Sequence, residues 1–300
     1  MSTLDRAVLV DLTGQAALVT GGGRGLGRAF ALALAKAGAK VAVTARTAAE
    51  VRETAEMVER DGGQAVGIPR DVSEPGAATE IVKTAESKLG PLEILVNNAG
   101  VMGPVGYNWN VNAEDWWRTF EVNMRGPFLC ARAVLPGMLA RRRGRIVNIS
   151  SGAAFNSFPQ MAAYCATKAA LTHWTNCLAR ETQAQGVVVF AYAPGFVRTP
   201  GTEYLTGSAD VPNETGDYFR AFLNERRDTP IARSAQLLLF LVSGRARCAL
   251  RPLHPRDRRR GGARPSCGRN TTGQLACPGR AKVGEGESVR SSVKTRLRAA

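Results

Sequence analysis

The sequence has little histidine and no clustered cysteine, which limits the metal chemistry it can host. Its 300 residues include two histidines and six cysteines. The cysteines show neither CxxC spacing nor a histidine at ligand distance, so the common zinc-binding patterns are excluded and we expect no metal site. Cys130, Cys165 and Cys177 lie in apolar helical segments. We interpret them as reduced core residues, which favours a reducing compartment.

Long hydrophobic runs are also absent. A strongly apolar run such as LLLFLV at 237–242 is far too short to span a membrane. The N-terminus lacks the basic-then-apolar pattern of a signal peptide. These absences argue against a membrane protein, and we expect a soluble, cytoplasmic one.

The net charge of +15 is unevenly distributed along the chain. Residues 1–244 contain 25 Lys/Arg and 22 Asp/Glu, whereas residues 245–300 contain 15 and 3. The first segment therefore reads as a near-neutral globular body. The second is an irregular basic tail rich in Arg, Pro and Gly, a composition that cannot bury a core, so we expect it to be disordered.

Short runs rich in valine, alanine and isoleucine alternate with amphipathic helical segments such as 48–60 and 77–89. Asn112, three residues before Asp115, is typical of a helix N-cap. Continuous apolar strands are buried on both faces, as in a parallel sheet. The alternation of strands and helices predicts an α/β fold: one Rossmann-type domain over 1–244 with a doubly wound parallel sheet. The ligands of such a fold bind outside the carboxyl ends of its strands. The expected strands are 16–20, 40–45, 65–72, 93–100, 145–150 and 187–195.

A glycine-rich turn, VTGGGRGLGRAF at 19–30, stands between the first expected strand and the first helix. Glycines in that position let the backbone approach a pyrophosphate, which then lies at the helix N-terminus. The second strand ends at Ala45 and Arg46, where an NAD-binding site would have an acidic residue, and Arg24 lies in the glycine turn. Two guanidinium groups and no carboxylate favour NADP(H), with NAD(H) as the alternative.

Tyr164 and Lys168 are one helical turn apart and share a helix face. A phenol is a poor acid or base at neutral pH unless a nearby cation favours its phenolate, and Lys168 could be that cation. Ser151 ends the preceding strand, where a hydroxyl could stabilise charge developing on a substrate oxygen.

These residues resemble the short-chain dehydrogenases/reductases. The likeness covers about residues 10–244 and depends on ordered motifs: TGGGRGLG (20–27), DV (71–72), NNAG (97–100), EVN ending at Asn123, Ser151, YCATK (164–168) and PGFVRT (194–199). The resemblance implies that Tyr164 is the general acid in carbonyl reduction and the base in alcohol oxidation. Lys168 would lower its pKa and hold the nicotinamide ribose, Ser151 would orient the substrate oxygen, and Asn123 would position a proton-relaying water.

The resemblance also implies a set of cofactor-binding residues. Gly21, Gly25 and Gly27 would shape the pyrophosphate turn, Asp71 and Val72 would meet the adenine, and Thr199 would contact the nicotinamide carboxamide. The full expected set is Gly21, Arg24, Gly25, Leu26, Gly27, Arg46, Asp71, Val72, Asn98, Ala99, Gly100, Tyr164, Lys168, Pro194, Gly195, Val197 and Thr199.

The substrate is less well defined by the sequence. Met102, Tyr107 and Trp109 follow an expected strand end and are candidate pocket walls. Residues 199–229 correspond to the mobile lid of the family, and their aromatic residues favour an at least partly apolar substrate. We interpret His173 as an ordinary helical residue rather than a catalyst.

The tail, 245–300, lacks the closing strand with which the family's domain ends. A frame shift near residue 245 explains this, because codons compatible with residues 247–259 also encode DALSGRFIHATD when read one base out of step. The alternative is an evolved arm that binds nucleic acid through phosphate contacts, but no interleaved aromatic residue supports it. We therefore favour a frame shift, with no nucleic-acid partner.

The predicted function is an NADP(H)-dependent oxidoreductase acting on a small-molecule carbonyl/alcohol pair. One alternative is a non-catalytic NADP(H)-binding scaffold or sensor, and the other is a nucleic-acid-binding protein acting through the tail. The resemblance implies a homo-dimer or homo-tetramer, although the altered C-terminus would damage such an assembly.

Overall fold

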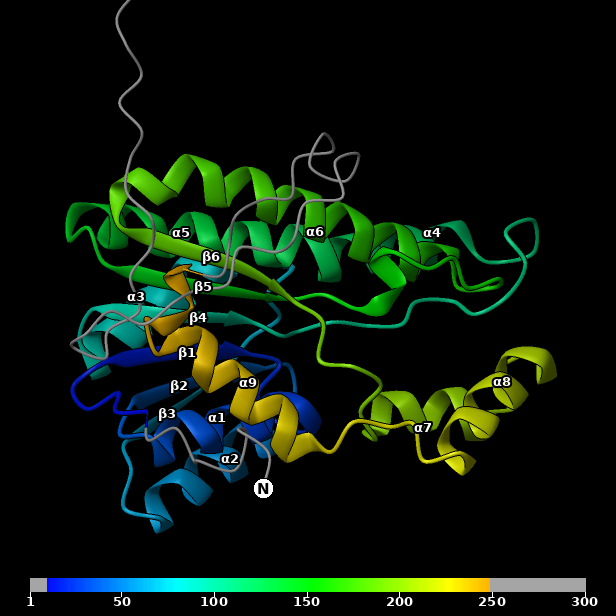
Figure 1. The fold of residues 1–300 in the computed structure, drawn as a ribbon, viewed down its shortest axis with the longest axis horizontal. Coiled ribbons are helices and arrows are strands. Elements are labelled where there is room, and N and C mark those ends of the chain that lie inside the picture. Colours follow the sequence, from blue (N-terminus) through cyan, green and yellow to red (C-terminus); the bar gives the residue numbers. More distant parts are fainter. Residues whose placement is uncertain (1–9, 249–300) are drawn as a thin grey trace, which may run out of the picture. The chain divides into compact units, whose positions relative to one another are not determined.

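A six-stranded parallel sheet forms the centre of the computed structural model, which describes residues 10–248 (Figure 1). The strand order is β3-β2-β1-β4-β5-β6, so successive strands add outward in opposite directions from β1. This is the doubly wound α/β architecture predicted from the sequence, and its switch point lies between β1 and β4. The strands are β1 (Ala16–Thr20), β2 (Lys40–Ala45), β3 (Ala65–Pro69), β4 (Leu92–Asn97), β5 (Gly144–Ile149) and β6 (Val187–Tyr192).

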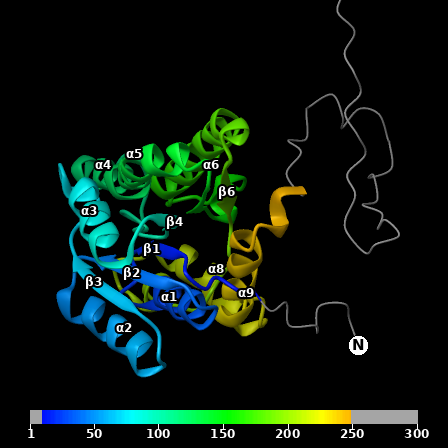
Figure 2. The same cartoon turned by 90° about the vertical axis from the view of Figure 1, so that its left-hand side faces the viewer.

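Helices cover both faces of the sheet (Figures 1 and 2). One face packs against α1 (Gly25–Lys36), α2 (Ala48–Arg60) and α9 (Ile231–Val242). The other packs against α3 (Ala77–Leu89), α5 (Gly126–Ala140) and α6 (Ala162–Thr182). All five residues of β1 are buried, as expected for a parallel strand with helices on both sides.

Three further helices lie beyond the carboxyl ends of the strands. α4 (Ala113–Phe120) follows β4, while α7 (Pro200–Gly207) and α8 (Asn213–Asn224) follow β6 (Figure 1). The Asn112 side chain accepts a hydrogen bond from the Asp115 amide at 3.0 Å and so caps α4 as predicted. Single 3-10 turns occupy Gly152–Ala154 and Gln183–Gln185.

Several strands end earlier than the sequence pattern predicts. β3 ends at Pro69 rather than residue 72, β4 at Asn97 rather than 100, and β6 at Tyr192 rather than 195. After β4, the amides of Asn98 and Ala99 donate to the Thr20 hydroxyl, at 3.0 and 3.1 Å, rather than to a neighbouring strand. The residues beyond these strand ends form loops at the edge where an α/β fold binds its ligands.

A π-helical turn, η1 (Glu121–Arg125), connects α4 to α5 and carries the buried Asn123. π-Helical turns are rare and occur frequently at functional sites, because the extra residue rotates side chains relative to the α-helix on either side. No feature of the sequence predicted it.

The cysteine prediction is correct only in part. Cys130 is buried, whereas Cys165 is half-buried and Cys177 is exposed. Cys177 lies on the outer face of α6, where the helix meets no neighbouring layer, so interpreting it as a core residue was wrong. Within residues 10–248, no helix is long and apolar enough to cross a membrane.

The C-terminal end of the described chain is a 3-10 turn, η4 (Arg245–Cys248). Packing continues past the predicted boundary at Gly244, since Ala246 is only 1% exposed and belongs to the core beneath α9. No strand follows β6 up to residue 248, so β6 is an edge strand of the described sheet. The predicted disorder and the proposed frame shift concern residues that lie, from 249 onward, outside the described part of the chain.

Candidate active site

Tyr164 and Lys168 lie side by side on α6, with the Lys168 Nζ 5.6 Å from the centre of the Tyr164 ring. Ser151 follows β5 in extended backbone, and its hydroxyl accepts a hydrogen bond from the Ala153 amide at 3.2 Å. The Ser151 hydroxyl also hydrogen-bonds the Tyr164 phenol. The fold thus brings together the three groups that the sequence separates by up to 17 positions.

Burial raises the pKa of the Tyr164 phenol, and the hydrogen bond with Ser151 only partly opposes this. The net direction of this shift is upward, and the expected lowering of the pKa of Tyr164 by Lys168 stays a prediction. Burial is the dominant influence here because the phenolate would lose its hydration. Tyr164 therefore keeps its proton at neutral pH, the state that a general acid requires.

Lys168 is buried, and its ammonium group donates to the Ile149 carbonyl oxygen at 2.8 Å. Burial lowers the pKa of Lys168 from 10.5 to about 8. A charged lysine at this position is costly, because water is replaced by a single carbonyl partner.

The lowered pKa of Lys168 predicts a stability that rises with pH. Above about pH 8 the folded chain has released the Lys168 proton, whereas the unfolded chain holds it up to 10.5. Between those values we expect the free energy of unfolding to gain about 1.4 kcal/mol per pH unit from this group. Urea unfolding of the protein without cofactor should show this slope between about pH 8 and 9; above pH 9 the buried Cys130 thiol, whose pKa burial raises from 9.0 to about 12, contributes the opposite slope. Lys168→Met should lose it, and Lys83→Met, at an exposed position on α3, should keep it; an unchanged slope in Lys168→Met would contradict the assignment.

Asn123 joins the loop after β4 to α6. Its side-chain amide donates to the Val101 carbonyl at 2.8 Å and to the Thr167 hydroxyl at 3.1 Å, and its oxygen accepts from the Val101 amide at 2.8 Å. Both donor hydrogens are thereby used. Asn123 and the Lys168 Nζ both border Gly100, where an added Cβ would lie 3.3 Å from the Asn123 oxygen and 3.7 Å from the Nζ. The predicted water relay through Asn123 stays a prediction.

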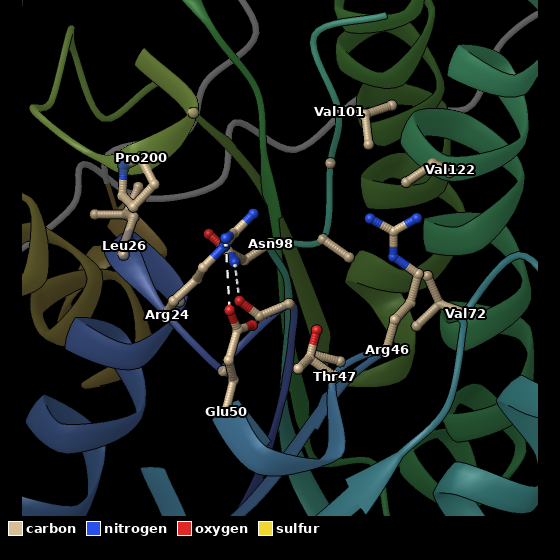
Figure 3. Close-up of a pocket in the computed structure, with 18 of the residues that line it drawn as sticks. Arg24, Leu26, Arg46, Thr47, Glu50, Val72, Asn98, Val101, Val122 and Pro200 are labelled. Atoms are coloured by element: carbon tan, nitrogen blue, oxygen red, sulfur yellow. Dashed lines mark hydrogen bonds and ion pairs between the residues drawn. The ribbon is translucent and has the colours of Figure 1, made fainter. Parts of the chain in front are cut away.

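A cavity of about 280 Å³ opens beside the glycine turn at the switch point between β1 and β4 (Figure 3). It brings together most of the predicted cofactor-binding residues: Gly21, Arg24, Gly25, Leu26, Gly27, Arg46, Asp71, Val72, Asn98, Ala99, Gly100 and Thr199. Pro194 and Val197 do not line it, and Gly195 lines a second cavity instead. Pro194 has a structural bond, since its carbonyl accepts from the Ser234 hydroxyl at 3.0 Å.

The glycine turn is held against the start of the loop after β4. The Asn98 side chain donates to the carbonyl oxygens of Thr20 at 3.0 Å and Gly21 at 3.1 Å. Gly21 has φ of 62°, and a Cβ there would lie 2.7 Å from the Ala99 Cα. Only glycine fits at position 21. The turn therefore leaves backbone N–H groups open to an approaching group such as a pyrophosphate.

Positively and negatively charged residues line the cavity beside the glycine turn, at the ends of β2 and β3. Arg46 lies near Asp71, whose carboxylate binds the Ser73 hydroxyl and amide and forms an ion pair with Arg118 at 2.6 Å. Burial opposes ionisation of Asp71, but these hydrogen bonds and the charges of Arg118 and Arg46 hold the pKa of Asp71 below its usual value.

Glu50 is a site residue that the sequence reasoning missed. It lies in the first turn of α2, and its carboxylate forms an ion pair with Arg24 at 3.5 Å (Figure 3). The expectation of two guanidinium groups and no carboxylate at this end was therefore wrong. The sequence did hold an indirect signal for Glu50. This residue is four positions after Arg46 and in the first turn of a helix, so its side chain can point back toward the end of β2.

The second cavity, of about 220 Å³, lies beside Ser151 and Tyr164. Met102 lines it as predicted, whereas Tyr107 and Trp109 do not. Those two rings stack on each other with centroids 4.8 Å apart and are 42% and 78% exposed. Their interpretation as pocket walls was wrong, because the loop turns their rings toward one another rather than inward. His173 is exposed on α6 and lines neither cavity.

Gln160, in the loop before α6, connects that loop to α8 and was also missed. Its side chain accepts from the Thr215 hydroxyl at 2.5 Å and donates to the Glu214 carboxylate at 3.2 Å. Its own backbone has φ of 67°, an uncommon conformation for a residue other than glycine. Partners more than 50 positions away leave no local pattern, so the sequence could not have identified this contact. No group of three or more metal-ligating side chains occurs within residues 10–248.

Comparison with known proteins agrees with this geometry. A family model described as short chain dehydrogenase matches residues 15–209. A short chain dehydrogenase of Pseudocercospora fijiensis is 40% identical over 191 residues, 63% of this chain and 62% of that protein. The chain thus spans less than two thirds of the length of this relative. A 3-oxoacyl-(acyl-carrier-protein) reductase of Synechocystis is 40% identical over 200 residues, 66% of this chain and 80% of that protein.

Among solved structures, a putative NAD(P) dependent gluconate 5-dehydrogenase from Beutenbergia cavernae, with bound NADP at low occupancy, is similar. It is 32% identical with a TM-score of 0.71, and the match covers 79% of this chain and 92% of that one. Sequence motifs, sheet order and site geometry agree with these matches, and the chain belongs to the short-chain dehydrogenase/reductase family.

Proposed function

We propose that this chain is an NADP(H)-dependent oxidoreductase that transfers hydride between the nicotinamide and a carbonyl/secondary-alcohol pair. The observation that carries the proposal is the placement of Ser151 and Tyr164 on the wall of a cavity that continues, through Met102, toward the glycine turn, with Lys168 next to Tyr164. Met102 lines both cavities, so a substrate oxygen near Tyr164 would lie at the border between them.

The residues present fit a dinucleotide. The glycine turn offers backbone space that a Cβ would fill, and Arg24, Arg46 and Arg70 line the same cavity. Gly21, Gly25 and Gly27 would hold the pyrophosphate, and Arg46 would bind a 2′-phosphate by charge-assisted hydrogen bonds. When bound, the nicotinamide supplies the hydride.

The proton chemistry belongs to the chain itself. In the reducing direction, the Tyr164 phenol would donate its proton to the substrate oxygen while the Ser151 hydroxyl holds that oxygen in place. Charge left on Tyr164 would be stabilised by the ammonium group of Lys168, one helical turn away. In the oxidising direction the same phenolate would accept the alcohol proton.

The preference for NADP(H) depends on the balance between Arg46 and Glu50. The guanidinium of Arg46 suits a phosphate, whereas the Glu50 carboxylate would repel one and could accept a ribose hydroxyl. We place Arg46 first because it lies near Asp71 but forms no ion pair within residues 10–248, whereas Glu50 is paired with Arg24. The bound NADP of the Beutenbergia cavernae protein supports the same choice.

One experiment tests both the reaction and the cofactor. NADPH and NADH oxidation are measured with a panel of neutral ketones, together with the Kd of each cofactor, for the protein and for Arg46→Ala. We expect turnover with NADPH, and in Arg46→Ala a Kd for NADPH raised by about tenfold or more, the value of one charged hydrogen bond. The Kd for NADH should change little.

Arg52→Ala is the matched control, because Arg52 lies six residues after Arg46, is exposed on α2 and lines neither cavity. Equal losses for both cofactors would contradict the role of Arg46. Binding of NADPH without reduction of any ketone, and without oxidation of the matching alcohols, would instead identify a non-catalytic scaffold.

A further inference from the structure

The second cavity has no formal charge on its walls. None of the described residues that line it is Asp, Glu, Lys, Arg or His. The Thr202 hydroxyl is committed to the chain, donating to the Val197 carbonyl at 2.9 Å and accepting from the Thr199 amide at 2.8 Å. The polar side-chain atoms left for a substrate are the hydroxyls of Ser151 and Tyr164, and at the rim that of Tyr218, which is 51% exposed.

Aromatic rings from three separate segments converge on this cavity. Phe158 comes from the loop before α6, Phe196 from the loop after β6, and Phe219 and Phe222 from α8. Phe196 stacks on Phe219 with centroids 5.2 Å apart, and Phe222 meets the Phe196 ring edge-on at 5.3 Å. Phe158 lies 6.1 Å from Phe219. Such an arrangement presents ring faces and edges to a guest ring, which adds to the gain from burying apolar area.

The size of the cavity limits the guest. Its volume is about 220 Å³, whereas a dry apolar cavity of about 150 Å³ is enough to bind benzene. One ring and a short side chain therefore fit. Met102 and Met161 on the walls allow small changes of shape, because an unbranched thioether adapts its rotamers.

We propose that this cavity takes a compact, neutral ketone or secondary alcohol that carries an aromatic ring next to the reacting carbon. This inference depends on the proposed function, whose Tyr164 and Ser151 hold the reacting oxygen. The ring lies among the phenylalanines, and a carboxylate or phosphate on it would lose its hydration without gaining a cation. Anionic substrates are therefore rejected.

The test compares four ketones with NADPH as cofactor: acetophenone, 4-methylacetophenone, 4-acetylbenzoate and 2-butanone. The second and third have similar shapes and differ in charge. We expect kcat/KM for 4-methylacetophenone to exceed that for 4-acetylbenzoate by about a hundredfold or more, because an unpaired carboxylate would be buried. Acetophenone should exceed 2-butanone by about tenfold or more through the added apolar area.

Two variants that introduce the same arginine make the test specific to the cavity. Tyr218→Arg places a cation at the rim and should narrow the ratio between 4-methylacetophenone and 4-acetylbenzoate by about tenfold. Tyr107→Arg introduces it at an exposed ring outside the cavity and should leave the ratio unchanged. A wild-type preference for 2-butanone or 4-acetylbenzoate would overturn the proposal while leaving the oxidoreductase function intact.

A binding measurement separates failure of this inference from failure of the reaction. Saturation-transfer NMR on the protein loaded with NADP+, which has no hydride to give a ketone, compares binding of 4-methylacetophenone with that of 4-acetylbenzoate. If no ketone is reduced but the neutral one still binds preferentially, the cavity assignment stands and the catalytic proposal fails. Equal binding, or binding of the carboxylate alone, overturns the cavity assignment whatever the turnover.

Discussion

Tyr164→Phe should lower kcat by about a hundredfold to ten-thousandfold, the usual contribution of a positioned general acid. The change removes one oxygen atom and keeps the ring in its place beside Lys168. Because burial raises the pKa of the Tyr164 phenol, this group carries the proton that reduction requires. No other hydroxyl of the described cavity lies beside both Ser151 and Lys168, so no residue should replace it.

The measurement must separate chemistry from binding. Tyr164 lines the second cavity and not the one beside the glycine turn, so the Kd for NADPH should stay nearly unchanged. The control is Tyr107→Phe, the same loss of oxygen at an exposed ring outside both cavities, which should keep full activity. Retained turnover in Tyr164→Phe, or loss of NADPH binding, would count against the proposed role.

Gly27→Ala should abolish NADPH binding. A Cβ at this position would overlap the Gly21 carbonyl oxygen and the Asn98 side-chain nitrogen. Neither atom can move freely, since the first belongs to the backbone and the second is hydrogen-bonded to Thr20 and Gly21. Relieving the overlap would open the glycine turn and misplace the backbone that receives the pyrophosphate. We expect the Kd for NADPH to rise by about a hundredfold or more, alongside about 1–3 kcal/mol of lost stability from overpacking.

Thermal unfolding with and without NADPH distinguishes the two effects. A bound cofactor raises the Tm of a protein that binds it. The native protein should show this rise, and Gly27→Ala should not, even where it remains folded. Gly207→Ala, on α7, meets no atom within 4 Å and should behave as the native protein does. A normal Tm rise in Gly27→Ala would show that the turn tolerates the methyl group, and would contradict the inference that only glycine fits at this position.

The charged end of the cofactor cavity shows how packing changes a sequence-based argument. Arg24 and Arg46 alone suggest a site built for phosphate. The fold adds Glu50 beside Arg24 and Asp71 near Arg46, so each guanidinium has a negative neighbour. We therefore expect the choice between NADP(H) and NAD(H) to depend on how strongly each arginine interacts with its neighbouring carboxylate. The distances between these groups decide that, and the residue types alone do not.

The sequence by itself determined the features that depend on local periodicity and backbone stereochemistry. Apolar runs predicted the strands and their burial, and the glycine turn predicted the position of the cofactor cavity. Asn112 predicted a helix cap, and the spacing of four between Tyr164 and Lys168 predicted a shared helix face. Each of these is encoded within a few neighbouring residues. For that reason these features do not depend on how the helices and strands pack against one another.

Only the tertiary structure decided the contacts between distant segments. It placed Glu50 against Arg24 and Gln160 against α8, and it turned Tyr107 and Trp109 away from the cavity. It also buried the Tyr164 phenol, which raises the pKa of that group. The physical reason is that the exposure of a side chain and its charged neighbours depend on how layers of helix and sheet meet. The sequence constrains this packing only through the apolar faces of the helices and strands.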